Sequence, residues 1–173
     1  MQETKTYSTT YTSPIGVYTL TSDGEALTGI WMVDQKYYLY GLGKDIVEKA
    51  DLPIFDAVKD WLDRYFAGKN PPITGLRLAP DGGEFKQMVW DILCKIPYGT
   101  TTTYGQIAKE IALKKGQKSM SSQAVGGAVG HNPISIIIPC HRVVGSDGSL
   151  TGYAGGLPTK IKLLELEGAA LQL

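Results

Sequence analysis

Residues 103–133 read TYGQIAKEIALKKGQKSMSSQAVGGAVGHNP, which is two short amphipathic segments with a break at Gly116 between them. In the first segment, apolar residues recur at the i, i+3, i+4 spacing of a helix. The second carries alanines and valines on one face and ends at Asn132-Pro133. Candidate helix caps are Thr102 or Thr103 for the first segment and Ser119 or Ser121 for the second. Two short helices around a turn predict a helix-turn-helix, an arrangement that can bind DNA.

Gly126 and Gly127 lie inside the second of these helices. A glycine in a helix interior costs about 0.5–1 kcal/mol relative to alanine. Two glycines there indicate a surface that another backbone approaches closely. That backbone belongs either to a neighbouring helix or to a ligand such as a DNA strand, and the sequence leaves both readings open.

The rest of the carboxy-terminal half is also mainly helical. Apolar residues at helical spacing predict helices over 85–96 and 159–167. Between them, the apolar run 134–139 leads to Cys140, and a glycine-rich loop follows at 145–156.

The amino-terminal half has a different pattern. Segments rich in Thr, Tyr and Val predict strands over 6–12, 15–21 and 26–33, and a helical pattern covers 52–66. A run of chain breakers then follows. We therefore expect a mixed α/β fold of the α+β type, with a small antiparallel sheet and a helix in domain 1–75, a linker at 76–83, and a mainly helical, winged-helix-like domain with the helix-turn-helix at 84–173.

Composition excludes several classes of protein. The chain has 173 residues, of which 43% are hydrophobic and 20% charged, as is usual for a globular protein with its own core. Two cysteines, Cys94 and Cys140, are too few for a disulfide framework. The first residues lack the features of a secretion signal, and no apolar run approaches the ~18 residues of a membrane span. We expect a monomeric, cytoplasmic protein with no membrane partner.

Charge is unevenly distributed along the chain. The net formal charge is zero, which argues against a general nucleic-acid binder. Residues 1–75 hold 7 basic and 10 acidic side chains, whereas residues 104–145 hold 5 basic side chains and one acid, Glu110. This second stretch is the candidate surface for an anionic partner, and a merely solvated basic face is the alternative.

Cys140 and His141 are neighbours in the segment Ile-Pro-Cys-His-Arg. A free thiol has an ordinary pKa of about 8.5 and is mostly protonated at neutral pH. Nucleophilic work therefore requires an imidazole, with a carboxylate behind it. Without such partners a buried cysteine is only a small packing residue. Since the imidazole is adjacent, Cys140 is the candidate nucleophile.

Four segments resemble the signatures of the 6-O-alkylguanine-DNA alkyltransferases, in the same order and at similar spacing. They are Thr103–Ala108, Ala124–Ala128 with Asn132-Pro133, Pro139–Val143 and Gly152–Gly156. This resemblance covers about residues 84–168, and residues 1–75 resemble the family's ribonuclease-H-like domain in architecture. It implies a DNA repair protein that moves an alkyl group, such as methyl, irreversibly from 6-O-alkylguanine to its own cysteine, once per molecule. The implied partner is double-stranded DNA containing 6-O-alkylguanine, and repair of 4-O-alkylthymine is left open.

The resemblance also implies roles for individual residues. Cys140 accepts the alkyl group, His141 activates it through a water, and Glu167 orients and charges His141. Tyr104 donates to the departing purine, and Asn132 ties the recognition helix to the active-site loop. The damaged base has to be flipped out of the duplex, from the minor groove. Contacts with DNA and the base are expected from Gln123, Ala124, Gly126, Gly127, Arg142, Val143, Tyr153, Ala154 and Gly155.

Two features depart from the usual pattern of this family. The helix position that usually carries an intercalating arginine is Gln123, which is shorter and uncharged, so weaker DNA binding and base flipping are expected. Some relatives hold a structural zinc through cysteines and histidines of the amino-terminal domain, but residues 1–93 contain neither residue type. We therefore expect no metal and no cofactor.

Three other functions would use some of the same residues. A Cys-His-Glu hydrolase needs an oxyanion hole and turns over esters or thioesters. A non-catalytic protein that recognises alkylated DNA shares this scaffold but has another residue in place of the cysteine. A transcriptional regulator needs a further sensor or partner domain.

Overall fold

The computed structural model describes residues 5–42 and 45–171, and the chain divides into two compact units, Met1–Asp81 and Gly82–Leu173. The boundary between the two units falls inside residues 76–83, which the sequence predicts to be a linker. Residues 1–4 and 172–173, at the outer ends of the predicted domains, lie outside the described residues, as do residues 43–44.

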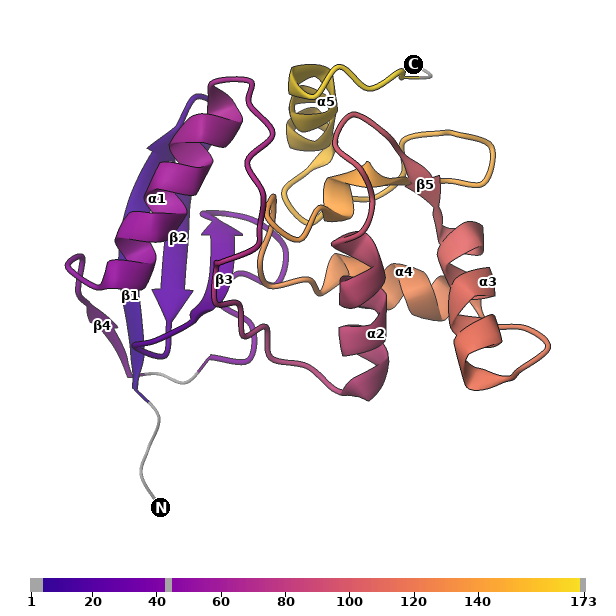
Figure 1. Cartoon of the computed structure of the whole chain (residues 1–173), viewed down its shortest axis with the longest axis horizontal. Helices are drawn as coiled ribbons and strands as arrows, with labels where there is room; N and C mark the ends of the chain where they lie inside the picture. Colours follow the sequence, from indigo (N-terminus) through magenta and orange to yellow (C-terminus); the bar gives the residue numbers. More distant parts are fainter. Residues whose placement is uncertain (1–4, 43–44, 172–173) are drawn as a thin grey trace. The chain divides into compact units, whose positions relative to one another are not determined.

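The first unit is a four-stranded sheet with one helix against it (Figure 1). Its strands are β1 (Thr6–Ser13), β2 (Gly16–Ser22), β3 (Leu27–Met32) and β4 (Ile46–Glu48), arranged β3-β2-β1-β4. The first three strands pair antiparallel, which confirms the three predicted strands. β4 pairs parallel with β1, so the sheet is mixed. The sequence did not predict β4, because three residues are too few to show a strand pattern.

Helix α1 (Pro53–Phe66) packs its apolar face against this sheet. Proline suits the start of a helix, where its missing N–H has no partner to lose. The buried side chains of α1 are Ile54, Phe55, Val58, Trp61, Leu62 and Tyr65. Phe66, the last residue of α1, is only half-buried and stacks on Tyr11 with ring centroids 6.4 Å apart.

The first unit extends beyond the predicted boundary at residue 75. The Leu27 amide donates to the Arg77 carbonyl, and the Ala79 amide donates to the Leu27 carbonyl, both at 2.8 Å. Residues 77–79 therefore pair with β3, although the sequence assigned them to the linker. Backbone pairing of this kind leaves no mark in a side-chain pattern.

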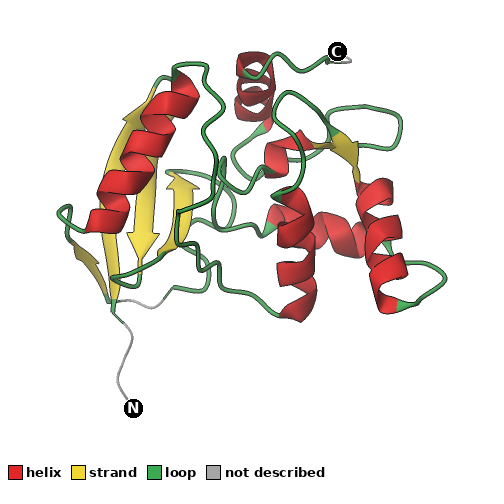
Figure 2. Cartoon of the chain, viewed as in Figure 1, coloured by secondary structure: helices red, strands yellow, loops and turns green. Residues whose placement is uncertain are grey.

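The second unit is mainly helical, as Figure 2 shows. Its α-helices are α2 (Glu84–Leu93), α3 (Tyr104–Lys115), α4 (Ser122–Gly130) and α5 (Leu157–Leu166). All four correspond to predicted helices. A single 3-10 turn, η1 (Cys140–Arg142), and two parallel two-residue strands, β5 (Thr102–Thr103) and β6 (Val143–Val144), complete the unit and were not predicted. None of the helices in the described part of the chain combines the length and hydrophobicity that crossing a bilayer requires.

Helices α3 and α4 form the predicted helix-turn-helix. The Thr103 hydroxyl accepts from the Gln106 amide at 3.1 Å, and the Ser121 hydroxyl accepts from the Ala124 amide at 3.2 Å, so these two residues are the caps. Gly116 ends α3 with a left-handed φ of 66°.

Trp90 fastens α2 to the second helix of this motif. Its side chain is buried, and its indole N–H donates to the Ala128 carbonyl of α4 at 2.9 Å. A buried indole needs an acceptor for its N–H, and here the backbone of α4 provides one.

Candidate active site

Cys140 is the first residue of η1 and is 6% exposed. Its backbone amide donates to the Ile138 carbonyl at 2.8 Å, which closes a tight turn through Pro139. The amide of a nucleophilic residue is a common oxyanion donor in hydrolases. Since the Cys140 amide is already bonded, this arrangement does not favour the hydrolase alternative.

A second tight turn precedes this one. Ile136 has a φ of 72°, a left-handed conformation that β-branched residues rarely adopt, and its side chain is buried. Across it, the Ile137 amide donates to the Ser135 carbonyl at 2.8 Å. Backbone conformations of this kind often occur where a functional group has to be held in place.

Asn132 connects the end of α4 to both turns. Its side-chain nitrogen donates to the Ile138 carbonyl at 2.8 Å, and its side-chain oxygen accepts from the Ile134 amide at 3.0 Å. Asn132 is buried. The helix-turn-helix is thereby joined to the segment that carries Cys140, the contact that the resemblance implied for this residue.

His141 and Glu167 form a fully buried pair. His141 Nε2 lies 2.6 Å from Glu167 Oε2, and neither side chain is exposed. An ionised carboxylate only accepts hydrogen bonds, so Nε2 carries the proton, and Nδ1 of a neutral imidazole keeps its lone pair. Nδ1 has no hydrogen-bond partner among the described residues. Glu167 caps the end of α5, and its other oxygen accepts from the Gly99 amide at 3.2 Å.

Arg142 is also part of this buried cluster, which corrects its predicted role in DNA binding. Its Nε and Nη2 donate to the two oxygens of Glu167 at 2.8 and 3.1 Å, and its Nη1 donates to the Ile96 carbonyl at 2.7 Å. The guanidinium also lies over the Tyr98 ring, 5.7 Å from the centroid. With its nitrogens bonded inside the unit and only 8% of the residue exposed, Arg142 does not reach a DNA backbone.

Burial lowers the pKa of His141 below its ordinary value, and Glu167 acts in the opposite direction. The positive charges of Arg142 and Lys160 lower this pKa further. His141 is therefore neutral in the resting protein at neutral pH. The expected orienting contact with Glu167 is present, but the expectation that Glu167 charges His141 is not met, because burial, together with the charges of Arg142 and Lys160, lowers the pKa of His141.

The Cys140 thiol is held in its protonated form at rest. Burial raises its pKa, and hydrogen bonding by Asn132, the charge of Lys160 and hydrogen bonding by Tyr153 lower it in part. A buried thiol of this kind needs a base to become a nucleophile. The neutral His141 next to it in the chain is suited to that role.

Sequence reasoning missed Lys160, a fully buried residue of α5. Its ammonium donates to the carbonyls of Val143, Thr151 and Gly152 at 2.6, 3.0 and 3.2 Å, and it forms no ion pair within the described residues. Burial lowers its pKa to about 8, and the Cys140 charge opposes this. One signal could have found it: Lys160 precedes the buried Leu163 and Leu164 at helical spacing, so it lies on the apolar face of α5.

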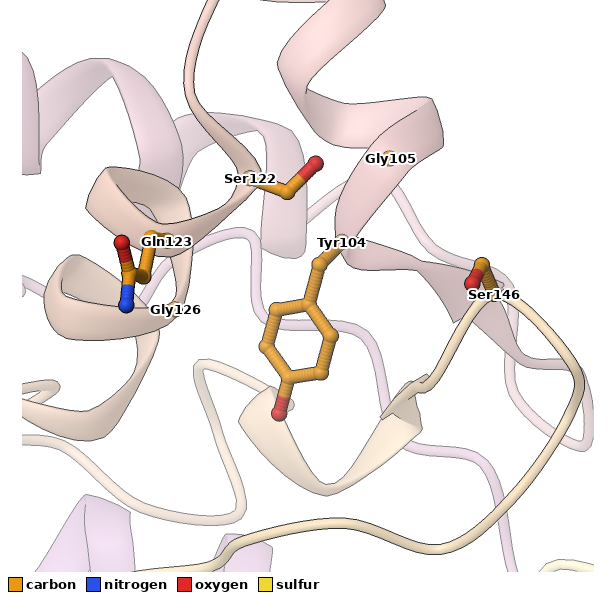
Figure 3. Close-up of a pocket in the computed structure, with 6 residues that line it drawn as sticks. All are labelled: Tyr104, Gly105, Ser122, Gln123, Gly126 and Ser146. Carbon is orange, nitrogen blue, oxygen red and sulfur yellow. The ribbon is translucent and has the colours of Figure 1, made fainter.

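Tyr104 lies beside a cavity at the start of the helix-turn-helix. The cavity has a volume of about 490 Å³ and is lined by Tyr104, Gly105, Ser122, Gln123, Gly126 and Ser146. Figure 3 shows the Tyr104 ring between the first turn of α4 and the loop that carries Ser146. The Tyr104 hydroxyl donates to the Thr151 carbonyl at 3.3 Å, and burial raises its pKa, so it stays protonated at neutral pH and remains a donor.

The glycines of α4 are not explained by packing inside the unit. A Cβ at Gly127 would meet nothing within 4 Å, and one at Gly126 would only touch the Tyr104 ring at 3.9 Å. Close packing against a neighbouring helix therefore does not account for Gly127, and the close approach of a DNA strand stays a prediction. Gln123, Ala124 and Gly127 are exposed on this side of α4, as a DNA-contacting surface requires.

The loop after β6 holds the remaining predicted residues. Tyr153, Ala154 and Gly155 are half-buried there, while Val143 is fully buried and contributes its carbonyl to Lys160. A Cβ at Gly155 would lie 2.9 Å from the Tyr153 ring, so this glycine makes room for the ring. The described residues contain no cluster of three or more metal-binding side chains.

The chain matches two family models that together cover most of its length. Residues 84–169 match the DNA binding domain of 6-O-methylguanine DNA methyltransferase, and residues 6–80 match its ribonuclease-like domain. Two relatives are each called methylated-DNA–protein-cysteine methyltransferase. The one from Haemophilus influenzae is 43% identical over 95% of this chain and 87% of its own, and the one from Methanosarcina acetivorans is 44% identical over 94% and 99%.

Solved structures agree with these matches. The crystal structure of O6-methylguanine methyltransferase from Mycobacterium tuberculosis superposes with a TM-score of 0.80 at 41% identity, covering 94% of this chain and 93% of that one. A crystal structure of OGT from the same organism in complex with DNA also has a TM-score of 0.80, at 41% identity and with 94% and 92% of the two chains covered.

Proposed function

Because the chain belongs to the 6-O-methylguanine DNA methyltransferase family, we propose that it repairs DNA by moving an alkyl group from the 6-oxygen of guanine to its own Cys140. The observation that carries this proposal is the buried His141–Glu167 pair, whose histidine directly follows Cys140 in the chain. It supplies the base that a buried thiol requires.

The chemistry is a displacement at the alkyl carbon. The Cys140 thiol gives up its proton to His141 Nδ1 by way of the water that the family resemblance implies, and the thiolate attacks the alkyl carbon. A carbon–sulfur bond forms as the carbon–oxygen bond to the purine breaks. The purine takes up a proton from the Tyr104 hydroxyl, and the proton that His141 took from Cys140 is released to solvent as solvent returns one to Tyr104, so that both residues end in their starting protonation states. A thioether has no easy route back to the thiol, so each molecule reacts once.

DNA binding belongs to the helix-turn-helix in this proposal. Helix α4 presents an open glycine surface at Gly126 and Gly127, and a strand backbone can approach it closely. The base must leave the duplex to reach Cys140, which costs a few kcal/mol and less when its pairing is already impaired. Gln123 fills the vacated stack less well than an arginine.

The test is the intact mass of the protein after incubation with a duplex that contains one 6-O-methylguanine, followed by peptide mapping. We expect one methylene unit to be gained per molecule, at Cys140. Cys94→Ser is the matched control and should react normally, because burial raises the pKa of Cys94 to about 11 and no base accompanies it. Cys140→Ser should bind the duplex and gain no mass.

Other outcomes would favour the alternatives. Binding without any gain in mass in the unsubstituted protein would indicate a damage-recognition protein. Neither binding nor gain, together with turnover of a thioester, would indicate the Cys-His-Glu hydrolase. The monomeric state and the cytoplasmic location remain predictions, which gel filtration and fractionation of cells test.

A further inference from the structure

The Glu167 carboxylate binds two charged or titratable side chains, those of His141 and Arg142, and the presence of both affects the protonation of His141. Its Oε2 faces both His141 Nε2, at 2.6 Å, and Arg142 Nη2, at 3.1 Å, while its Oε1 accepts from Arg142 Nε at 2.8 Å. An arginine that holds both oxygens of a carboxylate forms the strong two-bond pair. Most of the negative charge that would otherwise draw a proton onto His141 is therefore balanced by Arg142.

The other titratable groups around His141 do not favour its protonation either. Lys160 of α5 is a second buried cation, and it bonds only to carbonyls within the described residues. Cys140 on η1 is protonated at rest. Tyr98, in the turn after α2, lies under the Arg142 guanidinium and is neutral at physiological pH. Glu167 is thus the single acid that faces His141 from the described elements, and Arg142 shares it.

We propose that Arg142 is a positioning residue that keeps His141 uncharged in the resting protein, so that Nδ1 is free to take the proton of Cys140. The catalytic benefit of a neutral His141 rests on the proposed function, whereas the contacts of Arg142 that keep it neutral do not. Arg142 is itself anchored by a third bond, from Nη1 to the Ile96 carbonyl at 2.7 Å, which fixes the guanidinium against the Glu167 carboxylate.

Without the positive charge of Arg142, the negative charge of Glu167 should raise the pKa of His141. In Arg142→Gln, the His141–Glu167 pair should take up a proton at higher pH than in the unsubstituted protein, whichever of the two residues holds it. The state with both thiol and imidazole protonated cannot transfer an alkyl group, so the acid limb of the pH–rate profile should move upward. A shift of about one unit would slow transfer about tenfold on the acid side.

The experiment is a titration of His141 by 15N chemical shifts in full-length protein, in a Cys140→Ser background that removes the coupled thiol. The titration is repeated with three further substitutions in this background: Arg142→Gln, Arg142→Lys, which keeps the charge, and Lys162→Gln. Lys162 is exposed on the same helix as Lys160, so its substitution removes a charge without touching the cluster. We expect a higher pKa in Arg142→Gln and little change in the other two. Equal pKa values in all four proteins would overturn the proposal.

A second measurement does not depend on the folding of a variant. In the unsubstituted protein at neutral pH, the 15N shifts should report a neutral imidazole with its proton on Nε2. An imidazolium at neutral pH would refute the proposal, even if alkyl transfer to Cys140 is confirmed. Conversely, a neutral His141 in a protein that transfers nothing would refute the proposed function and leave this inference standing.

Discussion

Asn132 holds the two ends of the segment that leads to Cys140. Through one side chain it binds the carbonyl of Ile138 and the amide of Ile134, both buried, at 2.8 and 3.0 Å. A single side chain thus replaces the regular backbone pairing that this segment lacks. It also explains how the strained Ile136 is retained, because the backbone is fixed on both sides of it.

Asn132→Ala should destabilise the protein and slow alkyl transfer by more than the loss of stability accounts for. It leaves a buried carbonyl and a buried amide without partners, at a cost of about 1–3 kcal/mol for an unsatisfied group. Urea unfolding gives the free energy, and the rate is measured on the folded fraction. Asn70→Ala, an exposed asparagine of the other unit, is the control. A normal rate in folded Asn132→Ala would refute the positioning role.

Gly127→Ala should make the folded protein more stable and its binding to DNA weaker. No atom lies within 4 Å of the added Cβ, so the free protein should become more stable by about 0.5–1 kcal/mol, the ordinary gain for a helix interior. If a DNA strand approaches this surface closely, the same methyl group should weaken binding to duplex DNA. Thermal unfolding and a binding titration test both. Unchanged affinity would mean that the glycine serves no external partner.

Gln123→Arg should tighten binding to a duplex that contains alkylguanine. An added cation that meets a phosphate makes the logarithm of affinity fall more steeply with the logarithm of salt concentration, by about 0.9 per contact. Gln123 is exposed beside the Tyr104 cavity, so the new side chain has room. Asn70→Arg adds the same charge elsewhere on the surface. If both variants show the same affinity and the same salt dependence, insertion of the side chain at position 123 into the duplex is excluded.

Lys160 predicts a pH dependence of stability in the alkaline range. Its pKa is about 8 in the folded protein and ordinarily 10.5, so the unfolded chain binds more protons between these two pH values. Stability therefore rises with pH across that window as the cost of the buried charge is relieved, and the full cost is present below pH 8. In Lys160→Met this contribution should be absent. Urea unfolding of both proteins from pH 7 to 10.5 measures it, and parallel curves would mean that Lys160 does not titrate there.

Local pattern was sufficient for most of the secondary structure. The three strands of the first unit, α1 and the four helices of the second unit all have a clear period, so their positions followed from the sequence. β4, β5 and β6 have two or three residues each, and they exist only because a neighbouring strand pairs with them. Residues 77–79 were misassigned for the same reason.

The chemistry of Cys140 and His141 could be predicted from the sequence alone, because the two residues are neighbours and their types restrict what they can do. Of the partners that set their charge, only Glu167 was expected, from the family resemblance, and the roles of Arg142 and Lys160 beside it were not. Glu167, Arg142 and Lys160 lie up to 27 positions away from Cys140, and only folding shows that Arg142 turns inward to Glu167 rather than outward to DNA. Charge in a protein interior depends on distance and burial, and both arise when α5 packs against η1. The sequence by itself therefore predicted the nucleophile, its base and the DNA-binding helices, whereas the protonation of these residues at rest depends on the burial and the neighbouring charges that only the tertiary structure brings together.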